Sequence, residues 1–221
     1  RAIGESGGCT SHLPTAAHGA ANAEGLAVAV GCYGAPDELA CLRQVPASTL
    51  IANLSSLDFN PVVDGGVLPD QPRTLFDTHD FAKVPYLLGS NSDEGTLFFI
   101  GVTPVTTEVE YLAALQARYG PLASQVAALY PAASFASPQA ALMRAFGDEI
   151  LVCSTYDTAR RAAAGGARTY LYNFSRVIPI PILQALGLGA FHGSEIPYVF
   201  GSVTPPTPDD AAIAETMQGY W

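Results

Sequence analysis

The sequence predicts an α/β fold built around a largely parallel sheet. Helical patterns alternate along the chain with short apolar runs typical of buried strands, and no internal repeat is present. Of the 221 residues, 49% are apolar, which is enough for a sizeable core, whereas 17 Pro and 21 Gly keep the elements short. Because no linker-like stretch divides the chain, we expect one domain over 1–221.

The first part of the chain contains weak helix signals and one clear strand. Asn22 as a cap and Gly31 as a stop predict a helix between them. The apolar run over 84–89 is bounded by turn formers and predicts a strand that is buried on both faces. The expected elements in order are a strand end at 1–3, helices over 22–30, from Pro36 and from Pro46, a loop-like stretch over 58–83, and the strand.

The second part of the chain has stronger helix signals. Thr107 and Glu110 are spaced as a capping box, Leu112 and Leu115 follow at helical spacing, and Gly120 with the next proline ends the pattern. The further expected elements are helices over 122–129, from Ser137 and over 148–164, a buried strand over 169–174, and a last helix from Pro208 to the end.

Charge and hydropathy exclude two classes of function. Ten basic and twenty acidic residues give a net charge of −10, and no block of Lys or Arg is present to follow a phosphate backbone, so we expect no nucleic-acid partner. The longest uncharged apolar stretch, 177–191, contains two prolines and is shorter than the roughly twenty residues that cross a bilayer. We therefore expect a soluble protein without a transmembrane segment.

A Gly-x-Ser-x-Gly pentapeptide occupies residues 4–8, directly after the first expected strand. This pattern predicts a strained strand-to-helix turn that exposes the Ser6 hydroxyl, because glycines two positions before and after the serine leave room for close backbone packing. The pentapeptide alone is a weak signal. It gains meaning if an acid and a histidine follow it in that order.

An acid and a histidine do follow in that order, each on a loop after an expected strand. The loop beyond the strand over 84–89 carries Asp93 and Glu94, either of which could be the acid. His192 lies on a loop after the strand over 169–174, and open parallel sheets place catalytic groups at such carboxyl ends. The other histidines lie in segments without an acid or nucleophile at comparable positions: His12, His18 and His79.

These motifs resemble those of the type B carboxylesterases, a family of cholinesterases and fungal lipases with the α/β-hydrolase fold. Residues 4–8 resemble the nucleophile elbow of that family, with Gly7 where alanine is usual. The remaining similar segments are 59–65, which leads to the acid strand, 89–95, the acid loop, and 191–201, the histidine loop. The resemblance covers almost the whole chain, in order.

The resemblance implies a role for each motif residue. It makes Ser6 the nucleophile, Glu94 the acid and His192 the base, and it leaves Asp93 as a structural loop residue. The backbone N–H of Gly7, directly after the nucleophile, would donate to the oxyanion. The expected function is therefore hydrolysis of small-molecule or lipid carboxylic esters through an acyl-enzyme intermediate, without a cofactor or metal.

Two further glutamates and one apolar segment accompany these motifs. Glu5 and Glu195 are either acidic neighbours of the site or buried glutamates that bind loop amides. The apolar segment 178–188 either lines an acyl pocket or forms a core helix. Family members are longer and extend beyond both ends of this sequence, so we interpret 1–221 as a partial α/β-hydrolase catalytic domain. Alternative interpretations are a non-catalytic binding or adhesion domain, or an inactive fragment.

The four cysteines bear on the compartment. The spacing of Cys32 and Cys41 around a turn permits either a disulfide or two unpaired thiols. The resemblance implies the disulfide, because the family often has one at this position. Cys9 has no evident partner, and Cys153 matches a family cysteine whose partner lies outside this sequence. A disulfide and an acidic surface together favour a secreted or periplasmic location.

Overall fold

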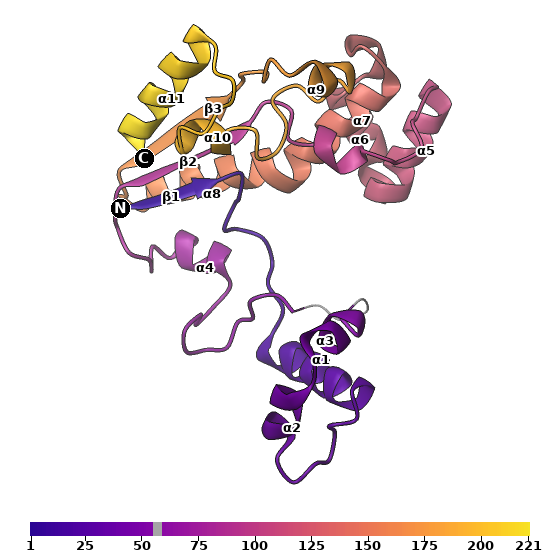
Figure 1. The fold of residues 1–221 in the computed structure, drawn as a ribbon, viewed down its shortest axis with the longest axis vertical. Helices are drawn as coiled ribbons and strands as arrows, with labels where there is room; N and C mark the ends of the chain where they lie inside the picture. The colour runs from indigo at the N-terminus through magenta and orange to yellow at the C-terminus, as the bar shows by residue number, and fades with distance from the viewer. Residues whose placement is uncertain (55–58) are drawn as a thin grey trace. The chain divides into compact units, whose positions relative to one another are not determined.

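The computed structural model describes residues 1–54 and 59–221 of the chain (Figure 1). The described chain divides into two compact units. Arg1–Cys9 and Phe81–Trp221 form the first, which we call the sheet unit, and Thr10–Asp80 form the second, which we call the disulfide unit. Every candidate triad residue lies in the sheet unit.

The sheet unit is built on three parallel strands in the order β1-β2-β3. Their bounds are β1 Ala2–Glu5, β2 Tyr86–Asn91 and β3 Thr169–Phe174. Glu5 pairs with Gly89, and Gly89 pairs with Tyr172, so the three strands run to the same edge of the sheet. The predicted parallel sheet is confirmed, with β2 shifted two residues from its expected start.

The strands differ in how deeply they are buried. Leu88 and Asn91 on the central strand β2 are fully buried. Tyr170 and Leu171 on β3 are 53% and 51% exposed, so the prediction that residues 169–174 form a buried strand is wrong for these positions. The reason is that β3 lies at an edge of the described sheet, where its apolar side chains have no further strand beside them.

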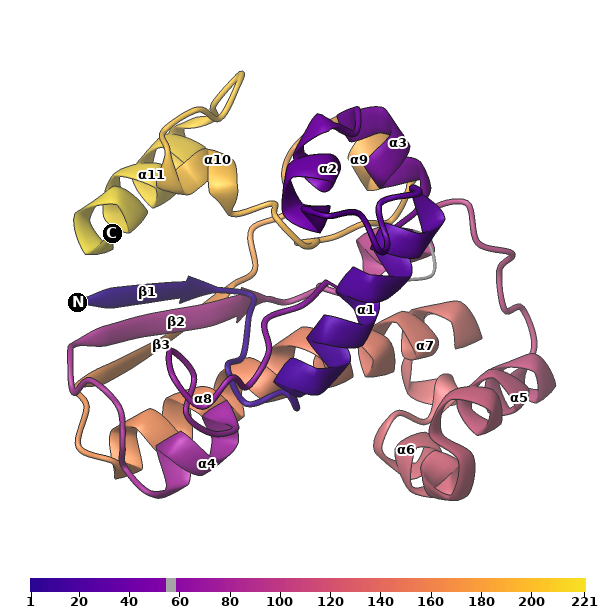
Figure 2. The ribbon, with the colours of Figure 1, turned by 90° about the horizontal axis from the view of Figure 1, so that it is seen from below.

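Helices cover both faces of this sheet. Figure 2 shows α8 along one face and the pair α10 and α11 on the other. Phe174 at the end of β3 belongs to the core under α10 and α11, together with the buried residues Ala190, Tyr198, Val199, Ala214 and Met217. The bounds are α8 Cys153–Ala164, α9 Pro181–Ala185, α10 Ile196–Val199 and α11 Pro208–Tyr220. The predicted last helix is thereby confirmed.

A second core of the sheet unit lies among α5, α6 and α7. The predicted capping box of Thr107 and Glu110 is confirmed at the start of α5, and Tyr111 and Leu115 of that helix are fully buried in this core. The bounds are α5 Glu108–Tyr119, α6 Ala123–Leu129 and α7 Pro138–Gly147. A π-helical segment, Asp148–Val152, joins α7 to α8, so the helix expected over 148–164 begins irregularly. Short 3₁₀ helices cover Thr96–Phe99, Gly120–Leu122 and Ala132–Ser134.

The disulfide unit is helical and differs most from expectation. Its helices are α1 Ala16–Ala29, α2 Glu38–Gln44, α3 Ala47–Ala52 and α4 Pro72–Asp77. The predicted cap Asn22 is wrong, because Thr15 caps α1 by accepting from the His18 N–H, and Asn22 lies inside the helix. Helix α4 interrupts the stretch expected to be loop-like, with Pro72 in its favoured first turn; Asp58, where that stretch starts, lies outside the described residues.

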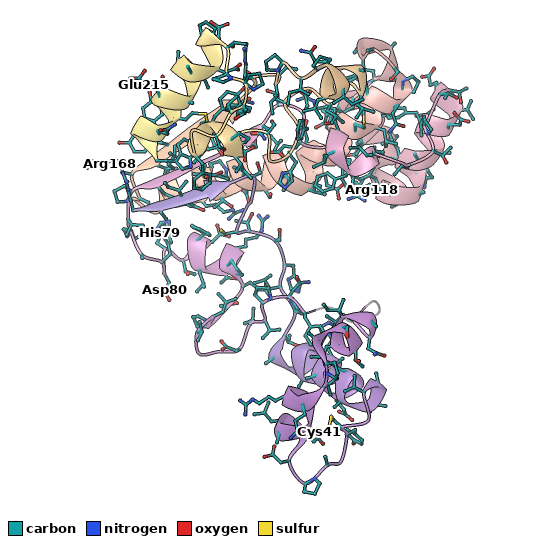
Figure 3. The ribbon with its side chains drawn as sticks, in the orientation of Figure 1. Cys41, His79, Asp80, Arg118, Arg168 and Glu215 are labelled. Atoms are coloured by element: carbon teal, nitrogen blue, oxygen red, sulfur yellow. A yellow bond between two sulfur atoms is a disulfide. The ribbon has the colours of Figure 1, made fainter. Side chains whose placement is uncertain are left out.

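A disulfide joins Cys32 and Cys41, with an S–S distance of 1.99 Å and a Cα–Cα distance of 5.6 Å. Figure 3 labels Cys41 beside the sulfur bond. The implied pairing is confirmed, and Cys9 and Cys153 are free thiols. Across residues 1–54 and 59–221, no helix is both long enough and apolar enough to span a membrane.

Asp210 fastens α11 to the rest of the sheet unit. Its side chain is fully buried, and it closes a capping box with Thr207 at the start of the helix. Arg176 Nε and the Tyr198 hydroxyl each donate to Asp210 Oδ1 at 2.8 Å. The Arg176 hydrogen bond, followed by those of Thr207, holds the pKa of Asp210 well below its ordinary value.

We expect Asp210→Ala to lower the free energy of unfolding by about 3 kcal/mol, because Arg176 and Tyr198 lose a buried acceptor. The measurement is urea unfolding, with the 80% exposed Asp209 replaced by Ala as a near-neutral control. The pKa of Asp210 is lower in the folded protein than in the unfolded chain. The stabilisation that Asp210 provides is therefore complete above about pH 4 and is lost as the pH falls further. Equal urea midpoints for the Asp210→Ala and Asp209→Ala variants would contradict the stabilising role of Asp210.

Candidate active site

Ser6 lies on the turn that directly follows β1. Its N–H donates to the Gly89 carbonyl at 2.8 Å, which holds the turn against β2. Its φ of +49° is in the left-handed region that side-chain-bearing residues rarely adopt, so the turn is strained as the pentapeptide predicts. The Oγ is buried and has no hydrogen-bond partner in the described part of the chain, so the prediction that the turn exposes this hydroxyl is wrong for this structure.

Close packing requires the glycine two positions after the serine and leaves little room beside the glycine two positions before it. A Cβ on Gly8 would lie 2.3 Å from the carbonyl carbon of Ser154 in α8, and a Cβ on Gly4 would lie 3.0 Å from the Tyr86 hydroxyl. No helix follows the turn directly, so the strand-to-helix prediction is wrong in its second half. Residues 7–14 contain two glycines and a proline, which disfavour a helix.

Glu94 and His192 form a direct pair on the loops beyond β2 and β3. His192 Nδ1 lies 2.8 Å from Glu94 Oε2. The other oxygen, Glu94 Oε1, accepts the Asn91 N–H at 2.7 Å. Glu94 is fully buried, whereas the His192 side chain is 36% exposed, so the imidazole has one edge against the acid and another toward solvent. Of the two carboxylates that the sequence left open, Glu94 is therefore the one that contacts His192.

Asp93, the rival carboxylate, binds the histidine loop at a different point. Its Oδ2 accepts the Ala190 N–H at 2.9 Å, and its N–H donates to the Ala190 carbonyl at 3.0 Å. Its Oδ1 lies 3.6 Å from an Arg144 nitrogen. These contacts join the acid loop to the histidine loop, which is the structural role that the resemblance implies for Asp93.

The family model described as the carboxylesterase family matches residues 1–221. The chain belongs to the carboxylesterase family. Its parallel sheet with helices on both faces is the α/β-hydrolase fold of that family. The fold and family inferred from the motifs are thus confirmed.

Two curated relatives of this carboxylesterase-family chain have named activities. A secreted lipase of Arthroderma benhamiae is 29% identical over 214 residues, which cover 86% of this chain and 37% of the lipase. The fumonisin B1 esterase of Sphingopyxis macrogoltabida is 38% identical over 151 residues, which cover 66% of this chain and 26% of the esterase. The chain therefore spans well under half the length of either relative.

The sequence left open whether Glu5 and Glu195 are acidic neighbours of the site or buried glutamates that bind loop amides. Glu195 is 2% exposed and accepts a short hydrogen bond from Asn91 Nδ2. Burial raises the pKa of Glu195, and the Asn91 hydrogen bond opposes that rise. Glu5 Oε1 accepts the indole N–H of Trp221. Both side chains are thus held by neutral donors.

Two residues at the site escaped the sequence analysis. The ring of Phe98 packs against the imidazole of His192, with centroids 5.4 Å apart. Asn91 contacts Glu94 of the acid loop through its backbone N–H and Glu195 of the histidine loop through its side chain. The signal for Phe98 is its place four residues after Glu94, on the 3₁₀ helix that the acid loop enters.

The apolar segment before His192 is largely exposed. The segment 178–188 contains the short helix α9, and Ile182 and Leu186 are 63% and 54% exposed, so the core-helix interpretation is wrong. Its role in an acyl pocket stays a prediction.

In the described residues, no three His, Cys, Asp or Glu side chains gather as a metal site requires.

Proposed function

We propose that this protein hydrolyses carboxylic esters of small molecules or lipids, with Ser6 as nucleophile, His192 as base and Glu94 as acid. The observation that carries the proposal is the 2.8 Å contact between His192 and the buried Glu94, on loops at the same sheet edge at which β1 leads into Ser6. Both named relatives are ester hydrolases by name, which supports the same reaction class. In this proposal, residues 1–221 form part of the catalytic domain.

The proposed reaction proceeds through an acyl-enzyme. His192 Nε2 removes the Ser6 proton as Oγ attacks the ester carbonyl, and then returns that proton to the leaving alcohol. Glu94 holds the Nδ1–H and stabilises the imidazolium that forms. Water then repeats both steps on the acyl group. Ser6 Oγ has no hydrogen bond in the described residues, and the proposed reaction requires one to His192 Nε2 to form when substrate binds.

Gly7 would contribute to stabilising the transition state. Its N–H directly follows the nucleophile, at the position from which this class of elbow donates to the oxyanion. One such donor is worth roughly 3 kcal/mol of barrier. The disulfide between Cys32 and Cys41 and the name of the secreted lipase relative support a secreted or periplasmic location.

Covalent labelling tests the proposal against a non-catalytic binding domain. An organophosphonate ester should add one adduct per chain, located on Ser6 by peptide mass spectrometry, because the activated Oγ attacks phosphorus as it attacks an ester carbonyl. Ser92→Ala is the matched control, since that hydroxyl binds Asn173 rather than Glu94 or His192 and its loss should leave labelling unchanged. A folded wild-type protein that stays unlabelled would favour the binding domain or the inactive fragment.

A further inference from the structure

Asn91, the last residue of β2, contacts three groups at the site through two nitrogen atoms. Its backbone N–H donates to Glu94 Oε1 at 2.7 Å. Its side-chain Nδ2 donates to the Phe191 carbonyl at 2.8 Å and also to the Glu195 carboxylate. Asn91 is fully buried, so these hydrogen bonds are shielded from competition by water.

The two acceptors of Asn91 Nδ2 lie on either side of His192 along the chain. The Phe191 carbonyl belongs to the residue directly before His192, so a hydrogen bond to it fixes the backbone that carries the imidazole. Glu195 follows His192 on the same loop, three residues later. Asn91 Nδ2 therefore holds the histidine loop on both sides of His192, while the Asn91 N–H holds the acid.

In the described residues, the Asn91 amide binds the site through its NH₂ group. Nδ2 carries two protons and faces two acceptors, so both protons are engaged. The buried Oδ1 has no hydrogen-bond partner in the described residues. Leucine and an ionised aspartate both fit roughly the same space, but neither donates a proton to the Phe191 carbonyl.

We propose that Asn91 is a positioning residue that fixes His192 relative to Glu94. This inference rests on the proposed esterase function and goes beyond it, because it assigns the alignment of base and acid to one buried amide. A misplacement of about 1 Å can cost roughly a hundredfold in rate, so alignment should affect the transition state more than substrate binding.

The test uses Asn91→Leu and Asn91→Asp, with Ser92→Ala as the neighbouring control. Hydrolysis of a p-nitrophenyl ester gives kcat and KM, and kcat is divided by the number of serines that an organophosphonate labels when the reaction is taken to completion. We expect kcat per labelled serine to fall roughly 10- to 100-fold in both Asn91 variants, with KM changed less than about threefold. A merely structural role would lower the number of labelled serines and leave kcat per labelled serine unchanged.

A double variant guards against misfolding caused by two facing carboxylates. Asn91→Asp combined with Glu195→Gln restores a donor and acceptor between these positions but leaves the Phe191 carbonyl without a donor. We expect its kcat per labelled serine to stay at least about tenfold below wild type. A value within about twofold of wild type, in this variant or in both single variants, would overturn the positioning role.

The two proposals fail in different ways. If the wild type neither hydrolyses the ester nor takes the label, the esterase function and the positioning role are both rejected. If the wild type is active and the Asn91 variants match it per labelled serine, the positioning role alone is rejected.

Discussion

Ser6→Ala should reduce hydrolysis of a p-nitrophenyl acyl ester by at least about 10⁴-fold in kcat. The reason is that no acyl-enzyme can form without the Oγ, and the described structure has no other serine on a strained turn at this sheet edge. Steady-state rates of purified wild type and variant give the comparison directly.

A loss of folding should not account for the lower rate of Ser6→Ala. Alanine at φ +49° carries about the same backbone strain as serine, and the buried Oγ of Ser6 has no hydrogen bond to lose in the described residues. The variant should therefore unfold at a urea concentration close to that of wild type, and Ser92→Ala should retain the wild-type rate. Equal esterase rates for wild type and Ser6→Ala would refute the proposed nucleophile.

The proposed triad residues could be picked out in the sequence because parallel topology places the loops after the strands at one edge of the sheet. β1, β2 and β3 run to one edge, so Ser6, Glu94 and His192 are placed by the ends of their strands rather than by local contacts. The pattern left Asp93 and Glu94 undecided, since adjacent residues on a loop share the same strand end. Their different partners, Ala190 and His192, appear only in the folded chain.

The features that the sequence did not reveal depend on long-range contacts. α1 begins at Ala16, after the Thr15 cap, and the Ala16 N–H also binds the Val63 carbonyl, a contact that no local pattern contains. The acceptors of Asn91 Nδ2 lie 100 and 104 residues away in sequence. The exposure of Tyr170 on β3 depends on its neighbours, whereas the apolar pattern of a strand is the same with or without them.

Glu94→Gln should lower kcat by roughly 10³- to 10⁴-fold with little change in overall fold. The Asn91 N–H would hold the amide oxygen of the new side chain where Glu94 Oε1 now lies. The amide NH₂ would then face His192 Nδ1 and favour the tautomer that carries its proton on Nε2. In that tautomer His192 cannot accept the Ser6 proton, which is why the loss should be large.

Asp93→Asn is the matched control, because it makes the same chemical change one position earlier on the same loop. Asparagine keeps an oxygen to accept the Ala190 N–H and does not touch the imidazole, so kcat should fall less than about tenfold. Measuring kcat for both variants, each divided by its labelled serines, separates the two carboxylates. If Asp93→Asn were the more damaging change, Asp93 would be the acid, and the contact between Glu94 and His192 would have to be explained by structure alone.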